Sequence, residues 1–300
     1  MKTSSERRSL DAYLTERRGV VDAALERFLP DASTPPRRLH EAMRYSVFGG
    51  GKRLRPILAL ASYELAGGEG DAVLAPAVAT ELIHTYSLIH DDLPAMDDDD
   101  TRRGRPSCHK AFDEATAVLA GDALLTLAFE IVAREERLAP ERRLSVVSEL
   151  AAANGAAGMV GGQFADMEGE GAAATLEAVE FIHVGKTARP LRAAVLVGAL
   201  AAGASSDDVA ALATVGEKMG LAFQIADDLL DVTGTEEEMG KAVGKDADRG
   251  KLTYPSAAGA SAAEARAAEL TDEALVALGR FGDRAWALRV IARFVIERRN

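Results

Sequence analysis

The sequence predicts an all-α fold built from long helices in one domain, and three observations support this prediction. The chain of 300 residues is rich in alanine and leucine, whereas aromatic residues make up only 5%. Helices favour the first group and strands the second. Apolar residues recur three or four positions apart along most of the chain, which is the spacing of a helix face. No run combines strand-like alternation with hairpin turns at its ends.

Four helices are predicted in the first third of the chain, and each has a residue that begins or ends it. Pro30 ends the first helix, and glycines at 49–51 end the second. Pro56 suits the first turn of the third. Asp71 is the expected N-cap of the fourth, and Pro94 limits its far end. These helices cover residues 10–28, 39–47, 56–66 and 71–90.

The rest of the chain is predicted to hold further helices of the same domain. They cover residues 116–133, 141–159, 176–197, 207–231, 261–278 and 283–297. Ser261 is the expected N-cap of the 261–278 helix. The helices 71–90 and 207–231 carry few charges before their ends, so they are expected at the centre of a bundle. The charged, glycine-rich segment 233–251 is expected to be an active-site flap. No linker or repeat divides residues 1–300, which predicts a single domain.

Charge and cysteine content exclude several classes of function. The chain has 35 basic and 47 acidic residues and a net charge of −12, which disfavours sequence-independent nucleic-acid binding. The lone Cys108 cannot form an internal disulfide, which fits a reducing compartment. Residues 1–18 lack the apolar core of a secretory signal, and the apolar stretch 193–204 is shorter than the about 20 residues of a spanning helix. We therefore expect a cytoplasmic protein without stable membrane insertion.

Two acidic clusters stand at the C-terminal ends of two long, apolar predicted helices. Carboxylates there face the negative end of the helix dipole and one another, which is unfavourable without a cation. Carboxylates without histidine or cysteine suit a hard cation such as Mg²⁺. A solvated acidic turn could explain one cluster but explains two less well. An EF-hand is excluded, because Arg102 stands where that loop needs glycine. The clusters are Asp91, Asp92 and Asp97–Asp100, and Asp227, Asp228 and Asp231.

Two basic groups accompany the first acidic cluster. They are Arg102, Arg103 and Arg105, and Lys52, Arg53 and Arg55 in the segment GGGKRLRP at 49–56. Glycines let the backbone approach an anion, arginine binds phosphate oxygens with paired donors, and a helix N-terminus favours anions. The segment is not a Walker A loop, because Arg53 follows Lys52 where serine or threonine is required. A basic surface turn is the alternative for this segment alone.

Weaker signals come from single polar residues in apolar surroundings. His84 lies about two turns before the first acidic cluster, either facing the same site or buried in the core. Lys186 and Thr187 interrupt an apolar segment, where a lysine usually needs an anion. Gln224 and Lys241 flank the second acidic cluster.

The combination of acidic and basic groups on long apolar helices indicates one kind of ligand. Mg²⁺ would bridge the carboxylates and a diphosphate, and the cations would hold a second diphosphate. The helices would enclose an apolar cavity beneath them. A site of this kind suits an amphiphile with a diphosphate head and a hydrocarbon tail. Zinc is excluded at Cys108 and His109, because a second pair of ligands is missing.

The sequence resembles the trans-isoprenyl diphosphate synthases, in particular the bacterial farnesyl and geranylgeranyl diphosphate synthases. The matching motifs follow the order of that family from residue 48 to about residue 255, and together they are highly specific. They are GGGKRLRP (49–56), HTYSLIHDDLPAMDDDDTRRGRPSCHKAF (84–112), AGDALLTLAFE (120–130), GKT (185–187), FQIADDLLDVTG (223–234) and GK (240–241).

The resemblance implies an isoprenoid-synthase helical bundle with a central active-site cavity, a homodimer, and a role for each matched residue. About three Mg²⁺ ions would be held by Asp91, Asp92, Asp97, Asp227 and Asp231. The allylic diphosphate would contact Arg102, Lys186 and Lys241. Isopentenyl diphosphate would contact Lys52, Arg55, His84 and Arg103. The polar groups near the developing allylic cation would be Thr187 and Gln224.

The reaction that the resemblance implies is ionisation, condensation and elimination. Metal ions and cationic side chains stabilise the departing diphosphate. The double bond of isopentenyl diphosphate attacks the allylic cation, and a proton then leaves to the diphosphate. No side-chain general base is needed, and none is evident. Exclusion of water protects the cation, which suits a closing flap at 233–251.

Product length depends on the residues below the metal site. Tyr86 and Ser87 stand five and four residues before Asp91, and Tyr86 lies about 7 Å from it along the helix. In the family an aromatic residue here tends to close the cavity and stop growth at C15. We therefore expect (E,E)-farnesyl diphosphate, made from dimethylallyl and geranyl diphosphates. If Tyr86 is ordinary core, the C20 product geranylgeranyl diphosphate is the alternative.

Other functions fit the motifs less well. A terpene cyclase would carry a different second metal motif, whereas this chain has DDLLD at 227–231. A head-to-head condensing enzyme such as squalene synthase would lack GKRLRP. A non-catalytic partner subunit usually loses an acidic motif, and both are intact here. A purely structural bundle would not gather so many carboxylates and cations.

Overall fold

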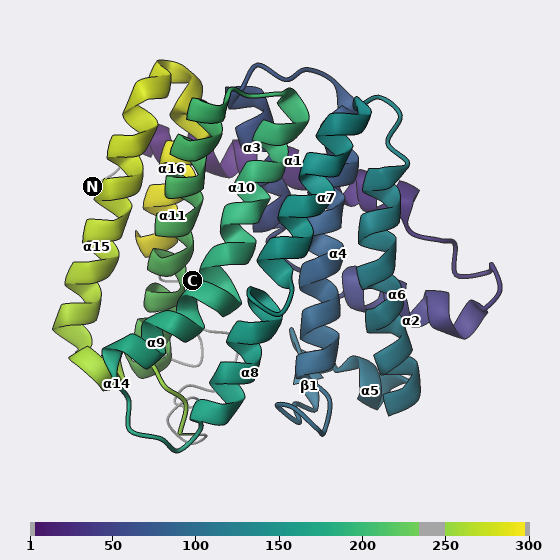
Figure 1. Ribbon diagram of the computed structural model, residues 1–300. Coiled ribbons are helices and arrows are strands. Elements are labelled where there is room, and N and C mark those ends of the chain that lie inside the picture. Colours follow the sequence, from purple (N-terminus) through teal and green to yellow (C-terminus); the bar gives the residue numbers. More distant parts are fainter. Residues whose placement is uncertain (1–3, 234–249, 298–300) are drawn as a thin grey trace.

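The computed structural model describes residues 4–233 and 250–297, and this part of the chain is helical almost throughout, which confirms the all-α prediction (Figure 1). Its long helices are α1 (Ser4–Phe28), α2 (Arg37–Val47), α3 (Leu54–Leu65), α4 (Leu74–Asp91), α6 (Glu114–Ala133), α7 (Pro140–Asn154), α8 (Met159–Gly169), α9 (Leu176–His183), α10 (Arg189–Ala202), α11 (Ser206–Thr233), α15 (Ala260–Ala277) and α16 (Trp286–Glu297). Its shorter elements are η1 (Asp71–Val73), α5 (Cys108–Ala111), η2 (Val184–Ala188), α14 (Tyr254–Ala258) and η3 (Leu278–Ala285). An antiparallel hairpin joins β1 (Thr101–Arg102) to β2 (Arg105–Pro106).

The helices pack around α4 and α10. Helix α4 contacts α3 and α6, and α10 contacts α3, α7 and α11 (Figure 1). Every residue of α4 from Leu74 to Ile83 is buried, as expected for a helix without a polar face. Helices α3 and α10 approach closely because residue 198 is glycine, since a Cβ there would lie 2.0 Å from the Ala59 carbonyl oxygen. The C-terminal end of α4 lies at the same end of the bundle as α8, α9 and β1 (Figure 1).

The predicted helix 141–159 matches α7 only as far as Asn154, because a non-helical turn separates α7 from α8. Gly155 ends α7, and its extended backbone leaves the helical region. Gly158 then turns back toward α7, where a Cβ would lie 2.1 Å from the carbonyl oxygen of Ala153. Only glycine fits such a close approach. The turn makes α8 a separate helix, which the sequence does not predict.

Two predicted N-caps are also wrong. Asp71 opens the short helix η1, and α4 begins three residues later at Leu74. Gly259 precedes α15 with a positive φ of 84°, so the helix has already begun before Ser261. The start of α6 has a side-chain cap instead: Thr116 donates its backbone N–H to the Asp113 carboxylate at 2.7 Å.

Three segments, Asp71–Asp91, Glu114–Ala133 and Ser206–Val232, are long and apolar enough to cross a membrane by length and composition alone. The expectation from the sequence rests on residues 193–204 and does not anticipate them. Their burial in the bundle differs: 78% of the apolar window of Asp71–Asp91 is buried, against 39% for Glu114–Ala133. Helix α6 therefore keeps an apolar face at the surface.

Candidate active site

A cavity of about 690 Å³ lies between α4, α7, α8, η2 and α11. Its polar residues include Arg55, His84, Asp91, Lys186, Thr187, Gln224 and Asp227. Much of its remaining wall is apolar and includes Ile83, Leu88, Leu150, Met159, Val160, Phe164, Pro190 and Phe223. The structure therefore brings together side chains from both acidic clusters with two of the predicted cations, Arg55 and Lys186. Tyr86 and Ser87 line the same cavity.

The first acidic cluster begins where α4 ends. Beyond Asp91 the chain turns back, and Asp97 donates its backbone N–H to the Asp91 carbonyl oxygen at 2.8 Å. Burial is the main cause that raises the pKa of the Asp91 carboxyl to about 6; Asp97 adds to the rise, and Lys186 opposes it. The protein thus holds this carboxylate under conditions that disfavour its charge. A divalent cation would relieve that cost, so Asp91 fits a hard metal ion.

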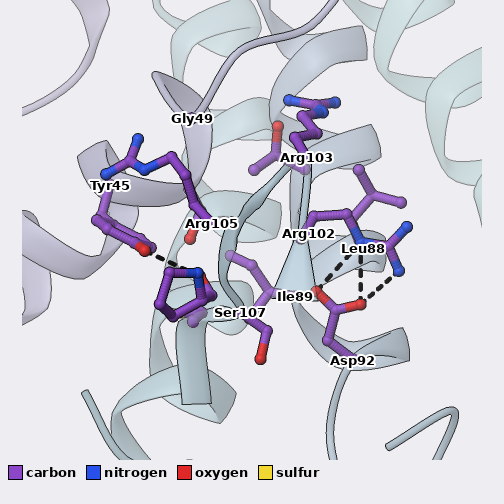
Figure 2. A pocket seen from close by; sticks show the side chains of 13 residues that line it. Tyr45, Gly49, Leu88, Ile89, Asp92, Arg102, Arg103, Arg105 and Ser107 are labelled. Carbon is purple, nitrogen blue, oxygen red and sulfur yellow. Dashed lines mark hydrogen bonds and ion pairs between the residues drawn. The ribbon is translucent and has the colours of Figure 1, made fainter. Parts of the chain in front are cut away.

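Asp92 has a different environment from Asp91. Its carboxylate is only 2% exposed and lines a separate small pocket beneath the β1–β2 hairpin (Figure 2). Arg102 donates from Nε to both carboxylate oxygens, at 3.0 and 3.3 Å. Figure 2 shows this pair as the main polar contact of the pocket. A predicted metal ligand and a predicted diphosphate ligand are therefore paired with each other.

The GGGKRLRP segment is positioned by Arg53. This side chain is buried, and its backbone has a positive φ of 53° at the start of α3. Its guanidinium donates to the Asp22 carboxylate at 2.9 Å, the Glu81 carboxylate at 2.7 Å and the Val47 carbonyl at 2.8 Å. Arg53 thus anchors the loop, while the next arginine along the chain reaches the cavity.

The predicted isopentenyl diphosphate ligands lie around this loop. Arg55 and His84 line the cavity, and Lys52, three residues before Arg55, is exposed. Arg103 reaches back from the hairpin turn to contact the carbonyl oxygen of Gly50. Burial, together with the nearby Arg55 and Arg103, lowers the pKa of His84 well below its usual value. Its imidazole is therefore neutral at pH 7.

Helix α9 does not run regularly into α10, as the predicted helix 176–197 would require. Five residues, Val184–Ala188, form a turn of π-helix. Such turns are rare and occur often at functional sites. The turn packs on α8 through two glycines, since a Cβ on Gly162 would lie 2.2 Å from the backbone nitrogen of Lys186. The wider turn carries Lys186 and Thr187 to the cavity.

The sequence does not single out Asp166, and it includes Lys251 only as the end of the predicted flap, yet both pair with predicted site residues. Asp166 on α8 is buried, and Lys186 donates to its carboxylate at 2.6 Å. The Lys251 ammonium lies 3.4 Å from an Asp97 oxygen and 3.8 Å from an Asp166 oxygen. The one available signal was an acidic residue within the apolar stretch MVGGQFAD. Only the tertiary fold brings Lys251 to Asp97.

The side chains of the second acidic cluster have two different environments. Asp227 lines the cavity. Asp228 is 3% exposed and accepts hydrogen bonds from Gln224 Nε2 at 2.9 Å and from the backbone N–H of Tyr254 at 2.8 Å. Asp231, one turn after Asp227, is also buried. Lys241 and most of the predicted flap 233–251 lie outside the described residues.

Another acidic group lies on the hairpin side of the site. Ligand atoms of Asp98, Asp100 and His109 lie within 4.8 Å of one another, so this group could hold a metal ion. Asp98 and Asp100 belong to the first acidic cluster, but the sequence does not predict that His109 lies beside them. Asp98 and Asp100 are exposed, and Lys110 already pairs with Asp100 at 2.8 Å. Asp91 and Asp227 fit a cation next to a diphosphate better, because they share the cavity with Lys186.

The fold and the cavity define a class of protein: an all-α enzyme with carboxylates and cations around one part of an otherwise largely apolar cavity. The polyprenyl synthetase family model matches residues 36–277, and the chain belongs to this family. It is a prenyltransferase. The family depends on Mg²⁺ and uses isopentenyl and allylic diphosphates as substrates.

Relatives fall into two product classes. The chain is 44% identical to a geranylgeranyl diphosphate synthase of Cyanophora paradoxa over the full length of both. It is 48% identical to a farnesyl diphosphate synthase of Geobacillus stearothermophilus, over 83% of this chain and 84% of that one. Among solved structures, an FPP/GFPP synthase from Zymomonas mobilis superposes with a TM-score of 0.85 at 40% identity, covering 96% of this chain and 99% of the other. These names do not decide the product.

Proposed function

We propose that the protein is a farnesyl diphosphate synthase, which condenses isopentenyl diphosphate with dimethylallyl and then geranyl diphosphate. The observation that carries this proposal is the meeting of Asp91 and Asp227 in one cavity. They come from helices far apart in the sequence, and both face the space shared with Lys186 and Arg55. This arrangement supports binding of a metal-bound diphosphate with a hydrocarbon tail on the apolar wall.

The residues divide the work of the reaction between charge and shape. Asp91 and Asp227 would hold Mg²⁺, with Asp97 and Asp231 close by in the chain. Bound there, Mg²⁺ supplies positive charge that favours departure of the allylic diphosphate. Lys186 and Lys251 add fixed positive charge on the same side, because Asp166 and Asp97 hold both ammonium groups near the site.

The second substrate would occupy the side of the cavity formed by Arg55 and His84. The neutral His84 ring can donate a hydrogen bond to a diphosphate oxygen without a second charge. The apolar wall excludes water from the allylic cation, which protects it from hydrolysis. The proton that leaves in the last step goes to the diphosphate, in keeping with the resemblance.

Tyr86 supports the C15 product. Its ring lines the cavity about 7 Å along α4 from Asp91 and is only 6% exposed. The His90 ring meets it edge-on, with centroids 5.6 Å apart, which limits its movement. A large, braced side chain at this depth would stop a growing chain.

A specific observation favours the C20 product as a second candidate. The cavity wall also includes Thr80 on α4, and Leu150 and Asn154 on α7. Thr80 stands eleven residues before Asp91, or about 16 Å along the helix. A tail that passes Tyr86 would find further room there.

Product analysis tests both candidates. Purified protein is incubated with Mg²⁺, labelled isopentenyl diphosphate and each allylic starter, and the dephosphorylated products are separated by chromatography. We expect C15 as the main product, loss of condensation with EDTA, and recovery with added Mg²⁺. A main C20 product would replace the first candidate with the second. No condensation with any starter would refute the enzymatic proposal.

Tyr86→Ala tests the residue that sets the length. Removal of the ring opens the cavity toward Thr80, so we expect a shift from C15 to C20 or longer products in the same assay. Tyr86→Phe is the control, because it keeps the ring and should keep the C15 product. An unchanged product distribution in Tyr86→Ala would place the floor of the cavity elsewhere.

A further inference from the structure

A buried chain of polar side chains leads from α9 to the cavity wall. The Asp228 carboxylate is its centre: Oδ1 accepts from Gln224 Nε2 at 2.9 Å, and Oδ2 accepts from the Tyr254 backbone N–H at 2.8 Å. His183 Nε2 lies 3.2 Å from the same Oδ2, and both of these side chains are almost fully buried. Thr187 Oγ1 donates to Gln224 Oε1 at 2.6 Å, and these two residues line the cavity.

The chemistry of Asp228 sets the direction of every hydrogen bond in this chain. An ionised carboxylate can only accept, so Gln224 must turn its NH₂ group toward Asp228. The Gln224 carbonyl oxygen must then face Thr187. Because this oxygen can only accept a hydrogen bond, the Thr187 hydroxyl must donate its one proton to Gln224. Any other group that approaches Thr187 Oγ1 therefore meets lone pairs.

We propose that Asp228 is a positioning residue that acts through Gln224 and fixes the polarity of the Thr187 hydroxyl. The inference rests on the proposed prenyl transfer, in which positive charge develops on the allylic substrate. A hydroxyl held with its proton away from that charge offers it the negative end of a dipole, already oriented before reaction. A freely rotating hydroxyl would have to reorient first.

This role separates Asp228 from its neighbour Asp227. Successive residues on a helix point about 100° apart, and only Asp227 lines the cavity. The Asp228 oxygens are already engaged by Gln224, Tyr254 and His183. Metal coordination by Asp228 would break these buried contacts, and each broken one would leave an unsatisfied polar group.

Asp228→Asn is expected to reverse the direction of these hydrogen bonds with almost no change in the shape of the side chain. The donors of Tyr254 and His183 still require an acceptor, so the asparagine carbonyl is expected on their side. Its NH₂ then faces Gln224, whose amide turns over and donates to Thr187 in its place. The Thr187 proton is released toward the cavity, where it opposes the developing charge.

A double-mutant cycle on kcat measures this effect. We expect Asp228→Asn to lower kcat by about 10- to 100-fold, less than the loss of a full oxyanion-hole donor, with the KM of each substrate and the Mg²⁺ half-saturation changed less than about twofold. In a Thr187→Val background, the same substitution should cause no further loss of kcat. Thr187→Ser should retain most of the wild-type kcat, because it keeps the hydroxyl.

Two outcomes would overturn the inference. One is an additive loss in the double mutant, which would mean that Asp228 does not act through Thr187. The other is a large increase in the Mg²⁺ requirement of Asp228→Asn. Asp227→Asn is the matched control for the metal readout, since it should raise that requirement. Should Asp228→Asn fail to fold, as judged by thermal melting, Gln224→Met replaces it in the cycle with the same non-additivity expected. Wild-type inactivity would instead refute the proposed function.

Discussion

Asp91 illustrates, at the scale of one residue, how a functional side chain can lower the stability of the folded protein. Its folded pKa of about 6 lies above its ordinary value of 3.8, so folding favours the protonated form. At pH values above about 6 the buried charge lowers the free energy of unfolding. Below about pH 4 the group is protonated in both states, and the penalty disappears.

Asp91→Asn is therefore expected to stabilise the protein while removing its activity. Without metal or substrate, the gain in unfolding free energy at pH 8 should approach about 2–3 kcal/mol, and it should vanish near pH 4. Urea unfolding in EDTA at both pH values measures it. Asp98→Asn, at an exposed position, is the control and should change stability little. A loss of stability at pH 8 would mean that Lys186 more than offsets the burial of Asp91.

Residue types were more predictable than residue partners. Apolar helices that end in carboxylates point to Asp91 and Asp227 from the sequence alone, because both must meet a cation. The pairing of Asp92 with Arg102 depends on the hairpin that follows, and nothing local specifies it. The sequence does contain one clue about Asp228: helical periodicity places it on a different face from Asp227.

At the scale of elements, the π turn decides which side chains reach the cavity. It inserts an extra residue into what would otherwise be one helix. That residue rotates the side chains of the following turns to a different face of the helix. Periodicity predicts helix throughout 176–197, because a π turn keeps the helical course and most of its apolar pattern. Its cause is tertiary: Gly162 and Gly220 let neighbouring helices approach Gly185 and Ala188 directly.

Gly162→Ala is expected to displace the π turn. The added Cβ would lie 2.2 Å from the Lys186 nitrogen and 2.7 Å from the Gly185 carbonyl carbon, and backbone must move to relieve both contacts. We expect a loss of about 1–3 kcal/mol in stability and at least about a tenfold loss of kcat.

Chemical unfolding and steady-state kinetics measure the two effects. Gly19→Ala on α1 is the matched control, because a Cβ there meets nothing within 4 Å and alanine favours a helix. Wild-type kinetics in Gly162→Ala would show that the π turn does not depend on this contact.

At the scale of the whole molecule, α6 is the least covered of the long apolar helices. Leu119 is 56% and Val118 is 40% exposed, and a groove between α1, α2 and α6 adjoins them. We propose that this apolar face contacts a second copy of the chain, in keeping with the homodimer that the resemblance implies.

Leu119→Glu tests the proposed dimer. We expect the wild-type protein to have the mass of a dimer by light scattering at micromolar concentration, and the variant to shift toward monomer. Val276→Glu on α15 is the control, because this valine is 80% exposed and helix α15 lies at the opposite edge of the bundle from α6 (Figure 1). A wild-type monomer would contradict the proposal.

The ion pairs of the site have a consequence for how its ligands bind. Arg102 pairs with Asp92, Lys186 with Asp166 and Lys251 with Asp97. A metal ion alone must therefore compete with internal cations, and a diphosphate alone must compete with internal carboxylates. Together they would exchange partners, because the metal would pair with the carboxylates and the diphosphate would pair with the cations.

Binding of the two ligands is therefore expected to be cooperative, and linkage requires the enhancement to be reciprocal. Calorimetric titration should give an Mg²⁺ affinity at least about fivefold higher with an allylic diphosphate analogue than without it, after correction for metal that the analogue binds in solution. Equal affinities would contradict this view. A positive result would mean that the protein responds to the metal–diphosphate complex as a unit and discriminates against either component alone.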